Sequence, residues 1–184
     1  IAGSKAGTVG HANGVGTAAR FNTPWGISMT NGGELIVTES AGKRVRRLQP
    51  VGADLSQPSS WLVTLVAGQT GLNTPTTASV DANGSAARFG EIKGLSIAAS
   101  GEIYVADWGN STVRRINTGG DVTTIAGDGT RAYGDSDTGL TAKFDRPTDV
   151  AVDRAGYLYV ADSTNRLVRR ISPAGAVGTV AGTG

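Results

Sequence analysis

The sequence contains no cysteine and a single histidine, His11. Without cysteine, the chain forms no disulfide bonds and offers no thiolate ligands to a metal. A catalytic zinc usually takes two or three imidazoles, and a Ser-His-Asp triad needs a histidine oriented by a buried acid. His11 lies in the glycine-rich stretch GTVGHANGVG, which supports neither arrangement. We therefore expect no catalytic residues, no cofactor and no enzyme activity.

Long apolar runs are also missing. No run approaches the roughly 18 residues of a membrane-spanning helix, and no signal peptide is recognisable, so we expect no membrane insertion. The 17 Lys and Arg against 15 Asp and Glu give a formal net charge of +2, which is little evidence for nucleic-acid binding. The 28 glycines and only 3 phenylalanines favour short strands with tight turns, and hence an all-β fold.

The sequence does contain a threefold internal repeat. The strings ELIVTESAGKRVRRL, EIYVADWGNSTVRRI and YLYVADSTNRLVRRI begin at residues 34, 102 and 157. The intervals Phe21–Glu39, Phe89–Asp107 and Phe144–Asp162 each measure 18 residues. A constant interval indicates one rigid unit that is repeated, with the variation in length confined to loops.

Each unit is expected to form four short antiparallel strands. In the second unit they lie at about 93–98, 102–107, 112–117 and 121–127. Such a sheet has two apolar faces and needs a neighbour on each, which radial stacking into a β-propeller supplies. We expect one segment over 1–184 with three four-stranded blades, at about 18–68, 86–127 and 141–182. A solenoid of β-arches is the alternative, but it needs parallel strands and shorter, more uniform periods.

These strands carry a family resemblance. Residues 146–184, RPTDVAVDRAGYLYVADSTNRLVRRISPAGAVGTVAGTG, closely resemble the NHL repeat, as do residues 92–127 and, less faithfully, 24–68. The resemblance implies a β-propeller, often six-bladed, that is used mainly for recognition. The first unit departs from the pattern, because VTES replaces VAD and residues 51–61 lengthen one connection.

An acidic residue recurs with a pair of arginines in every unit. If Gly109-Asn110 is a two-residue hairpin turn, Val105 faces Arg114 across the hairpin, and Asp107 lies within diagonal reach of Arg114. The expected ion pairs are Glu39–Arg46, Asp107–Arg114 and Asp162–Arg169. The following arginine of each pair is expected to stack on a tyrosine, Arg115 on Tyr104 and Arg170 on Tyr159.

The arginines have a second interpretation. Arg46, Arg114 and Arg169, with the arginine that follows each, would form a phosphate- or RNA-binding surface if they were exposed. The recurring acid favours ion pairs within and between blades instead. Nucleic acid is therefore not an expected partner.

A few residues stand outside the repeat. Trp25 and Trp108 have no aromatic counterpart in the other units, which makes them candidates for contact with a partner. DSDTG at 135–139 places Asp135 and Asp137 as in a calcium loop, although no glutamate follows in register, so the metal expectation is a weak one. Asn83 and Asn110 match the N-glycosylation sequon.

Together these features favour a non-catalytic propeller scaffold for protein–protein interaction or self-assembly. The partners would be other blades, from a second copy or from further sequence, and a protein. The alternative is a blade face that binds glycan, peptide or RNA through the loops 68–88 and 127–143. The sequence does not define a compartment, and we favour an extracellular or cell-surface location.

Overall fold

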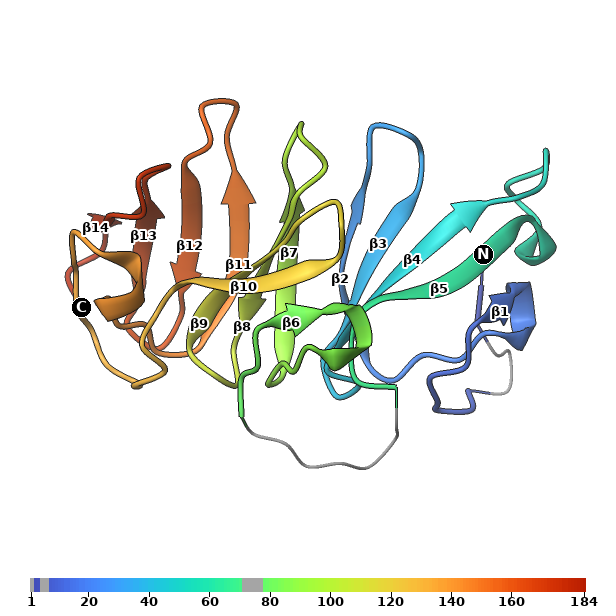
Figure 1. Cartoon of the computed structure of the whole chain (residues 1–184), viewed down its shortest axis with the longest axis horizontal. Helices are drawn as coiled ribbons and strands as arrows, with labels where there is room; N and C mark the ends of the chain where they lie inside the picture. Colours follow the sequence, from blue (N-terminus) through green and yellow to red (C-terminus); the bar gives the residue numbers. More distant parts are fainter. Residues whose placement is uncertain (1, 4–6, 71–77) are drawn as a thin grey trace.

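The structure, a computed structural model, describes residues 2–3, 7–70 and 78–184. This part of the chain consists of β-strands and short 3-10 turns without an α-helix, so it includes no helix capable of crossing a membrane. The 3-10 turns are η1 (Gly16–Ala18), η2 (Pro58–Ser60), η3 (Gly84–Ala86) and η4 (Gly139–Thr141). The strands form three antiparallel sheets, which follow one another along the chain (Figure 1).

Within each sheet the four repeat strands lie in sequence order from the inner edge outwards, and in the first two sheets a short preceding strand is added at the outer edge. The first sheet runs β2 (Pro24–Met29), β3 (Leu35–Glu39), β4 (Arg44–Pro50), β5 (Trp61–Gly68) and β1 (Gly14–Val15). The second runs β7 (Ile92–Ile97), β8 (Ile103–Asp107), β9 (Thr112–Ile116), β10 (Asp121–Ala126) and β6 (Ala82–Asn83). The third runs β11 (Pro147–Val152), β12 (Leu158–Asp162), β13 (Leu167–Ile171) and β14 (Val177–Ala181).

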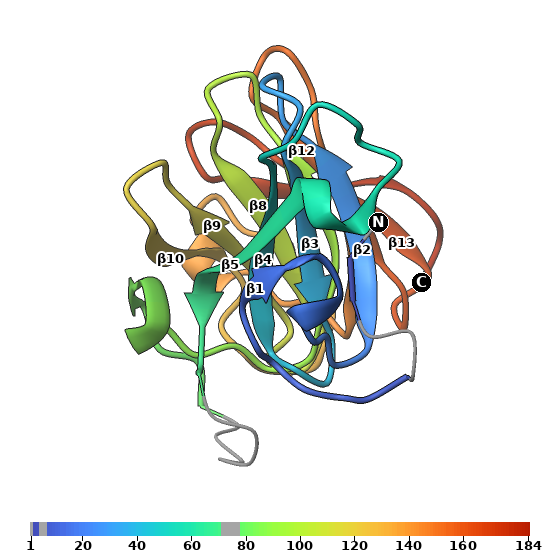
Figure 2. The ribbon, with the colours of Figure 1, turned by 90° about the vertical axis from the view of Figure 1, so that its right-hand side faces the viewer.

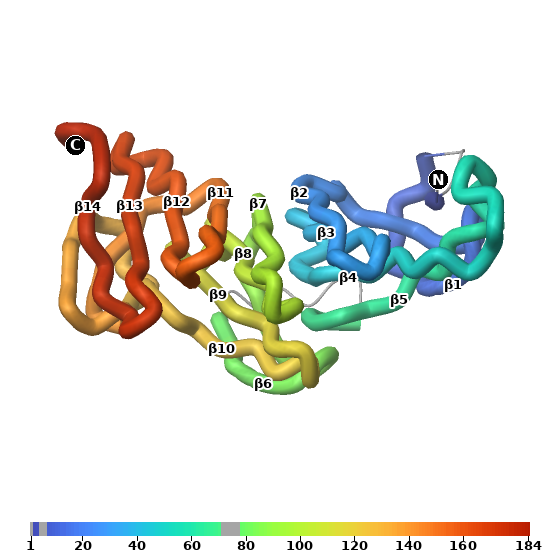
Figure 3. Tube along the Cα trace, turned by 90° about the horizontal axis from the view of Figure 1, so that it is seen from above, coloured from blue at the N-terminus to red at the C-terminus, as the bar shows by residue number. Residues whose placement is uncertain are grey.

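The sheets radiate from their first strands. Strand β7 contacts both β2 and β11 at the centre. Seen from above, the first sheet extends to the right of these strands, the second downward and the third to the left (Figure 3). The end-on view places β1 and β5 at the outside of the first sheet (Figure 2). This is the radial stacking expected for sheets that are apolar on both faces.

The hydrophobic core is divided between the sheets. One cluster lies between the first and second sheets and includes Ile36, Val45 and Phe89. A second cluster lies between the second and third sheets and includes Val113 and Phe144. Both phenylalanine rings are at most 1% exposed, so the repeated Phe lies at the centre of each interface between sheets. A third cluster, with Leu35, Val37 and Trp61, lies on the far face of the first sheet and leaves part of that face exposed.

Two sheets contain a strand that the repeat pattern did not predict. The two-residue strands β1 and β6 pair with the outermost repeat strands, β5 and β10. In the third sheet a bridge between Ser136 and Val177 occupies the same place. The expected blades start at residues 18, 86 and 141, but each sheet includes residues before that point. The segment that precedes each unit folds back onto the outer strand of the sheet.

The central hairpins have the expected register and a different turn. Val105 pairs with Arg114 and Tyr104 with Arg115, but the last pair is Asp107 with Thr112, so the turn has four residues. Positive φ falls on Ser111 (φ 55) and on its counterparts Lys43 and Arg166, not on the Gly-Asn pair. Asn110 instead closes the turn, because its N–H donates to Asp107 O (3.2 Å).

Candidate interaction surfaces

Each repeated arginine is buried and donates hydrogen bonds to three separate segments of the chain. Arg114 shows the pattern. Arg114 Nη1 donates to Asp107 Oδ2 (3.1 Å) and to Arg88 O (3.0 Å), and its Nη2 donates to Asp81 Oδ1 (2.7 Å). Its guanidinium carbon lies 5.1 Å from the centre of the Phe89 ring. The side chain is 0% exposed. The arginine thus holds the segment that carries β6 against the sheet, which explains the additional strand.

The same tie recurs in the other two sheets. Arg46 lies 3.1 Å from Glu39, and Arg169 lies 3.0 Å from Asp162, all with fully buried side chains. The position of Asp81 is taken by Asn13 (2.9 Å from Arg46) and by Asp135 (2.6 Å from Arg169). The three arginines proposed as binding candidates therefore present no surface to a ligand.

Asp135 also bears on the expected metal site. Its carboxylate accepts hydrogen bonds from Arg169 and from the backbone and side chain of Thr179. Burial alone raises the pKa of Asp135, but hydrogen bonds from Arg169 and Thr179 lower it overall. Within the described residues no cluster of three or more acidic or histidine side chains is placed to hold a metal ion. Asp135 thus accepts hydrogen bonds from Arg169, whereas the sequence suggested that it binds a cation together with Asp137.

The buried acids are surrounded by donors. Asp107 accepts hydrogen bonds from Gly90 N (3.0 Å), Asn110 N (3.3 Å), Asn110 Nδ2 (2.9 Å) and Arg114. Burial raises the pKa of Asp107, against the opposing charge of Arg114 and the hydrogen bond from Asn110. Because the Asn110 side-chain amide is engaged, modification at this sequon would break a buried contact. The Asn83 amide also donates, to Gly119 O and Asp121 Oδ1 (both 2.9 Å), but these contacts lie at the exposed surface, so a glycan there would disturb no buried acid.

In the first sheet a second arginine replaces the asparagine. Gly42 stands where Asn110 stands in the second sheet, and Arg44 Nε lies 3.2 Å from Glu39 Oε2. Burial raises the pKa of Glu39, while the charges of Arg46 and Arg44 oppose that rise. Nearby, burial and the charges of the same two arginines lower the pKa of His11, which is only partly buried.

The second arginine of each pair does not stack as predicted. Arg170 lies over Tyr157 (4.9 Å to the ring centre) and not over Tyr159. Arg115 forms an ion pair with Glu102 (3.6 Å) in place of a stack on Tyr104. In both sheets the arginine contacts the residue that immediately precedes the second repeat strand, which is Glu102 before β8 and Tyr157 before β12. This residue lies two positions before the tyrosine that we expected as the partner.

Trp25 and Trp108 belong to one mixed stack of aromatic and basic side chains. Lys93 Nζ lies 3.8 Å from the ring centre of Trp25 and 5.3 Å from that of Trp108, and the Arg146 guanidinium lies 4.8 Å from Trp108. Lys93 also donates to Ser40 Oγ of the first sheet (3.1 Å). The stack therefore links all three sheets. Trp25 is its outermost member, and its side chain is 57% exposed to solvent.

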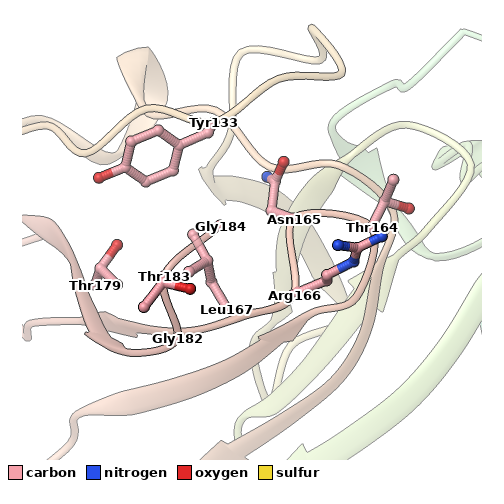
Figure 4. Close-up of a pocket in the computed structure, with 9 residues that line it drawn as sticks. All are labelled: Tyr133, Thr164, Asn165, Arg166, Leu167, Thr179, Gly182, Thr183 and Gly184. Carbon is pink, nitrogen blue, oxygen red and sulfur yellow. The ribbon is translucent and has the colours of Figure 1, made fainter.

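A pocket lies where the loop 127–143 approaches the third sheet (Figure 4). Tyr133 stands on one side and the hairpin turn with Asn165 and Arg166 on another, around a volume of about 390 Å³. Asn165 Nδ2 donates to Ala132 O (3.0 Å), which fixes this loop to the turn. Of the other long loop, 68–88, residues 71–77 lie outside the described residues.

The two end sheets each leave one apolar face open. On the first sheet the leading face, defined by Trp25, Ile27 and Met29 on β2, has these side chains 57%, 63% and 62% exposed. The counterparts of Ile27 in the next two sheets, Leu95 and Val150, are 8% and 4% exposed because a neighbouring sheet covers them. A groove of about 270 Å³, lined mainly by apolar side chains, lies on the leading face.

The third sheet has the opposite face uncovered. This trailing face is defined by Tyr159, Val168, Val180 and Ala181. Val168 is 40% exposed, whereas its counterparts Val45 and Val113 are 0% exposed. Val180 is 53% exposed, and Ala181 is exposed where Ala126 is buried.

Comparisons with known proteins bear on this geometry. The chain matches an auxiliary nutrient binding protein from Bacteroides thetaiotaomicron, with a TM-score of 0.65 and 22% identity, over 83% of this chain and 36% of that chain. It matches a gluconolactonase from Xanthomonas campestris, with a TM-score of 0.56 and 12% identity, over 88% and 48% of the two chains. A nidogen/laminin complex gives a TM-score of 0.57 at 10% identity, over 89% and 50%.

The chain has a β-propeller fold. At these identities the likeness extends to the fold alone. No family profile matches the sequence. The Arabidopsis thaliana protein SUPPRESSOR OF QUENCHING 1, chloroplastic, is 30% identical over 109 residues, which are 59% of this chain and 9% of that protein. The chain thus spans about a third of the length of the first structural relative and less than a tenth of this one.

Sequence reasoning missed the second acceptors of the buried arginines. Asn13, Asp81 and Asp135 precede the repeated phenylalanines by 8, 8 and 9 residues, so a signal was present in the spacing. It also missed Lys93 and Arg146, which complete the stack with the two tryptophans. No spacing within one repeat reveals them, because they come from different sheets.

Proposed function

We propose that this chain is a non-catalytic scaffold segment: three NHL-type blades of a six-bladed propeller, whose end blades pack against further blades of the same kind. The observation that carries the proposal is the exposure of Ile27 and Val168 at positions that are covered in every internal blade interface. Contiguous apolar surface of this kind is uncommon on an isolated soluble domain and indicates an interaction site.

The energetic gain from covering these faces is substantial. Full burial of an Ile, Met or Val side chain stabilises by about 1.5–3 kcal/mol. Ile27 and Met29, 63% and 62% exposed, would each contribute about 1–2 kcal/mol on that scale. Val168 and Val180 would add smaller amounts on the other side.

A tandem chain tests the scaffold proposal. Two copies joined in one polypeptide place a trailing face and a leading face within reach at high effective concentration. We expect the tandem protein to unfold in one transition at a higher midpoint than the single chain, by about 1 °C for each kcal/mol gained, because the unfolding unit comprises two copies of 184 residues. It should also bind less of a dye that reports exposed apolar surface. An unchanged midpoint with undiminished dye binding would refute the proposal.

A second candidate function is ligand binding at the loops. It is favoured by the pocket beside Tyr133, whose volume of about 390 Å³ falls within the range of small-molecule sites. Neutral oligosaccharides and short peptides are suitable probes in a thermal-shift series. A shift that is present in the natural chain and lost in Tyr133→Ala would support this function, and the absence of any shift would count against it.

A further inference from the structure

We infer that the partner for both open faces is a second copy of this chain, so that two copies close one six-blade ring. This inference rests on the proposed scaffold function and names its partner. In the ring, the trailing face of each copy would pack on the leading face of the other. The two contacts would be related by a twofold axis through the centre.

The trailing face of the third sheet nearly duplicates a surface that the chain already packs. Tyr104, Val113, Ile125 and Ala126 form the corresponding face of the second sheet and pack on the third sheet. At the same positions the trailing face has Tyr159, Val168, Val180 and Ala181. Three residues are identical and the fourth exchanges isoleucine for valine, so the trailing face has the composition that a leading face accepts.

The leading face matches its counterparts in the same way. The second sheet packs on the first through Phe89, Leu95, Ile97, Ile103 and Val105. The first sheet has Phe21, Ile27, Met29, Leu35 and Val37 at these positions. Ile27 and Met29 are the exposed ones, while Leu35 and Val37 are already buried in the cluster on this face. Every exchange is between apolar side chains of similar size. The contact between copies would thus continue the two interfaces already formed within the chain.

The arrangement of the sheets leaves room for three more. Viewed along the central strands, the three sheets spread to the right, below and to the left, and no strand lies above them (Figure 3). A second copy therefore supplies the number of sheets that closure needs. A head-to-tail contact that did not close would propagate into a filament.

One polar position makes the contact more specific. Trp25 occupies the position that Lys93 has in the second sheet, and Ser163 occupies that of Ser40. Since Lys93 contacts Ser40 across the first interface, Trp25 of one copy should lie near Ser163 of the other. Its exposed indole would then be shielded from solvent on assembly.

The test uses charge substitutions on the two open faces. The unsubstituted chain of 184 residues should have the mass of two copies of 18.6 kDa, about 37 kDa, in light scattering at micromolar concentration. Ile27→Lys alone, or Val168→Glu alone, places an unpaired charge in both contacts of the ring and should weaken association by at least about a hundredfold. Val80→Lys is the matched control, because Val80 precedes β6 of the middle sheet, away from both open faces, and is 41% exposed against 40% for Val168.

Mixing the two variants tests the head-to-tail geometry. An Ile27→Lys chain and a Val168→Glu chain can form one natural contact and one in which lysine faces glutamate. The mixture should therefore recover the 37 kDa particle, and acrylamide quenching of the tryptophan fluorescence should fall with it, because Trp25 is the most exposed of the three tryptophans. Circular dichroism should show that both variants fold, because the altered side chains are exposed.

The outcomes separate this inference from the scaffold proposal. Natural chains that stay monomeric up to high micromolar concentration, while the tandem protein gains stability, would overturn the second-copy partner and leave the scaffold proposal standing. Open filaments, or a dimer that both variants leave intact, would also overturn it. Failure of the tandem protein to gain stability would overturn both.

Discussion

Glu39→Gln removes the one carboxylate found, within the described residues, beside the Arg46 guanidinium. The remaining acceptors of Arg46 there are Asn13 Oδ1 and backbone carbonyls, all of them neutral. Both side chains of the pair are 0% exposed, so water cannot replace the lost charge without a rearrangement. Breaking a buried pair by removing one partner typically costs about 3–5 kcal/mol. We expect a loss in that range.

Asp107→Asn provides the comparison within the same protein. Arg114 keeps the carboxylate of Asp81 at 2.7 Å, so its charge stays compensated. The loss should then be limited to weakened hydrogen bonds in the buried turn, at about 1–3 kcal/mol. The prediction is an ordering: Glu39→Gln should be the more damaging change by about 2 kcal/mol.

Urea unfolding at pH 7 measures both losses. All variants should be compared at one chain concentration, because any association adds to the apparent stability. The side-chain volume is unchanged in each substitution, so cavities do not enter the comparison. Since burial raises the pKa of Glu39, the main competing possibility is a protonated carboxyl. Equal losses for the two variants would refute the reasoning from an uncompensated arginine.

Three further outcomes follow from the site. The pKa of Asp135 is lowered overall in the folded chain, so the stability it contributes should be present above about pH 4 and be lost as the pH falls through the folded-state value. Asp135→Asn should therefore flatten the acid limb of a stability–pH curve. On expression in a secretory host, peptide mass spectrometry should find glycan on Asn83 and none on Asn110. Lactone hydrolysis assays should detect no turnover, and a turnover lost in His11→Ala would contradict the non-catalytic proposal.

Much of the fold follows from local pattern. The constant interval from phenylalanine to acid defines a unit that must place the acid beside the arginine seven positions later, and Asp107 and Arg114 meet in this way. Period-2 alternation with short turns is enough to predict antiparallel sheets and their register. The radial packing follows from the two apolar faces of each sheet.

The residues that sequence reasoning missed are linked through tertiary packing. Asp81 reaches Arg114 from 33 positions away, by a segment of too little regularity to be recognised as a strand. Lys93 and Trp25 meet only because β7 lies against β2, and the sequence interval between them has no structural meaning of its own. That the end sheets need further blades follows from the sequence, but the side chains that remain exposed do not, because Ile27 and Leu95 have the same pattern and differ only in what covers them.

The first sheet shows why a departure from the repeat need not be a defect. Its acid is Glu39, one methylene longer than Asp107, and a Cβ at Gly42 would lie 2.7 Å from Glu39 Oε2. Asparagine therefore cannot occupy this position as it does in the second sheet at Asn110. Arg44 supplies an N–H to the acid in its place. The first sheet therefore provides hydrogen bonds to its buried acid in a second way. Its three departures from the repeat, Glu39, Gly42 and Arg44, explain one another and have to be considered together.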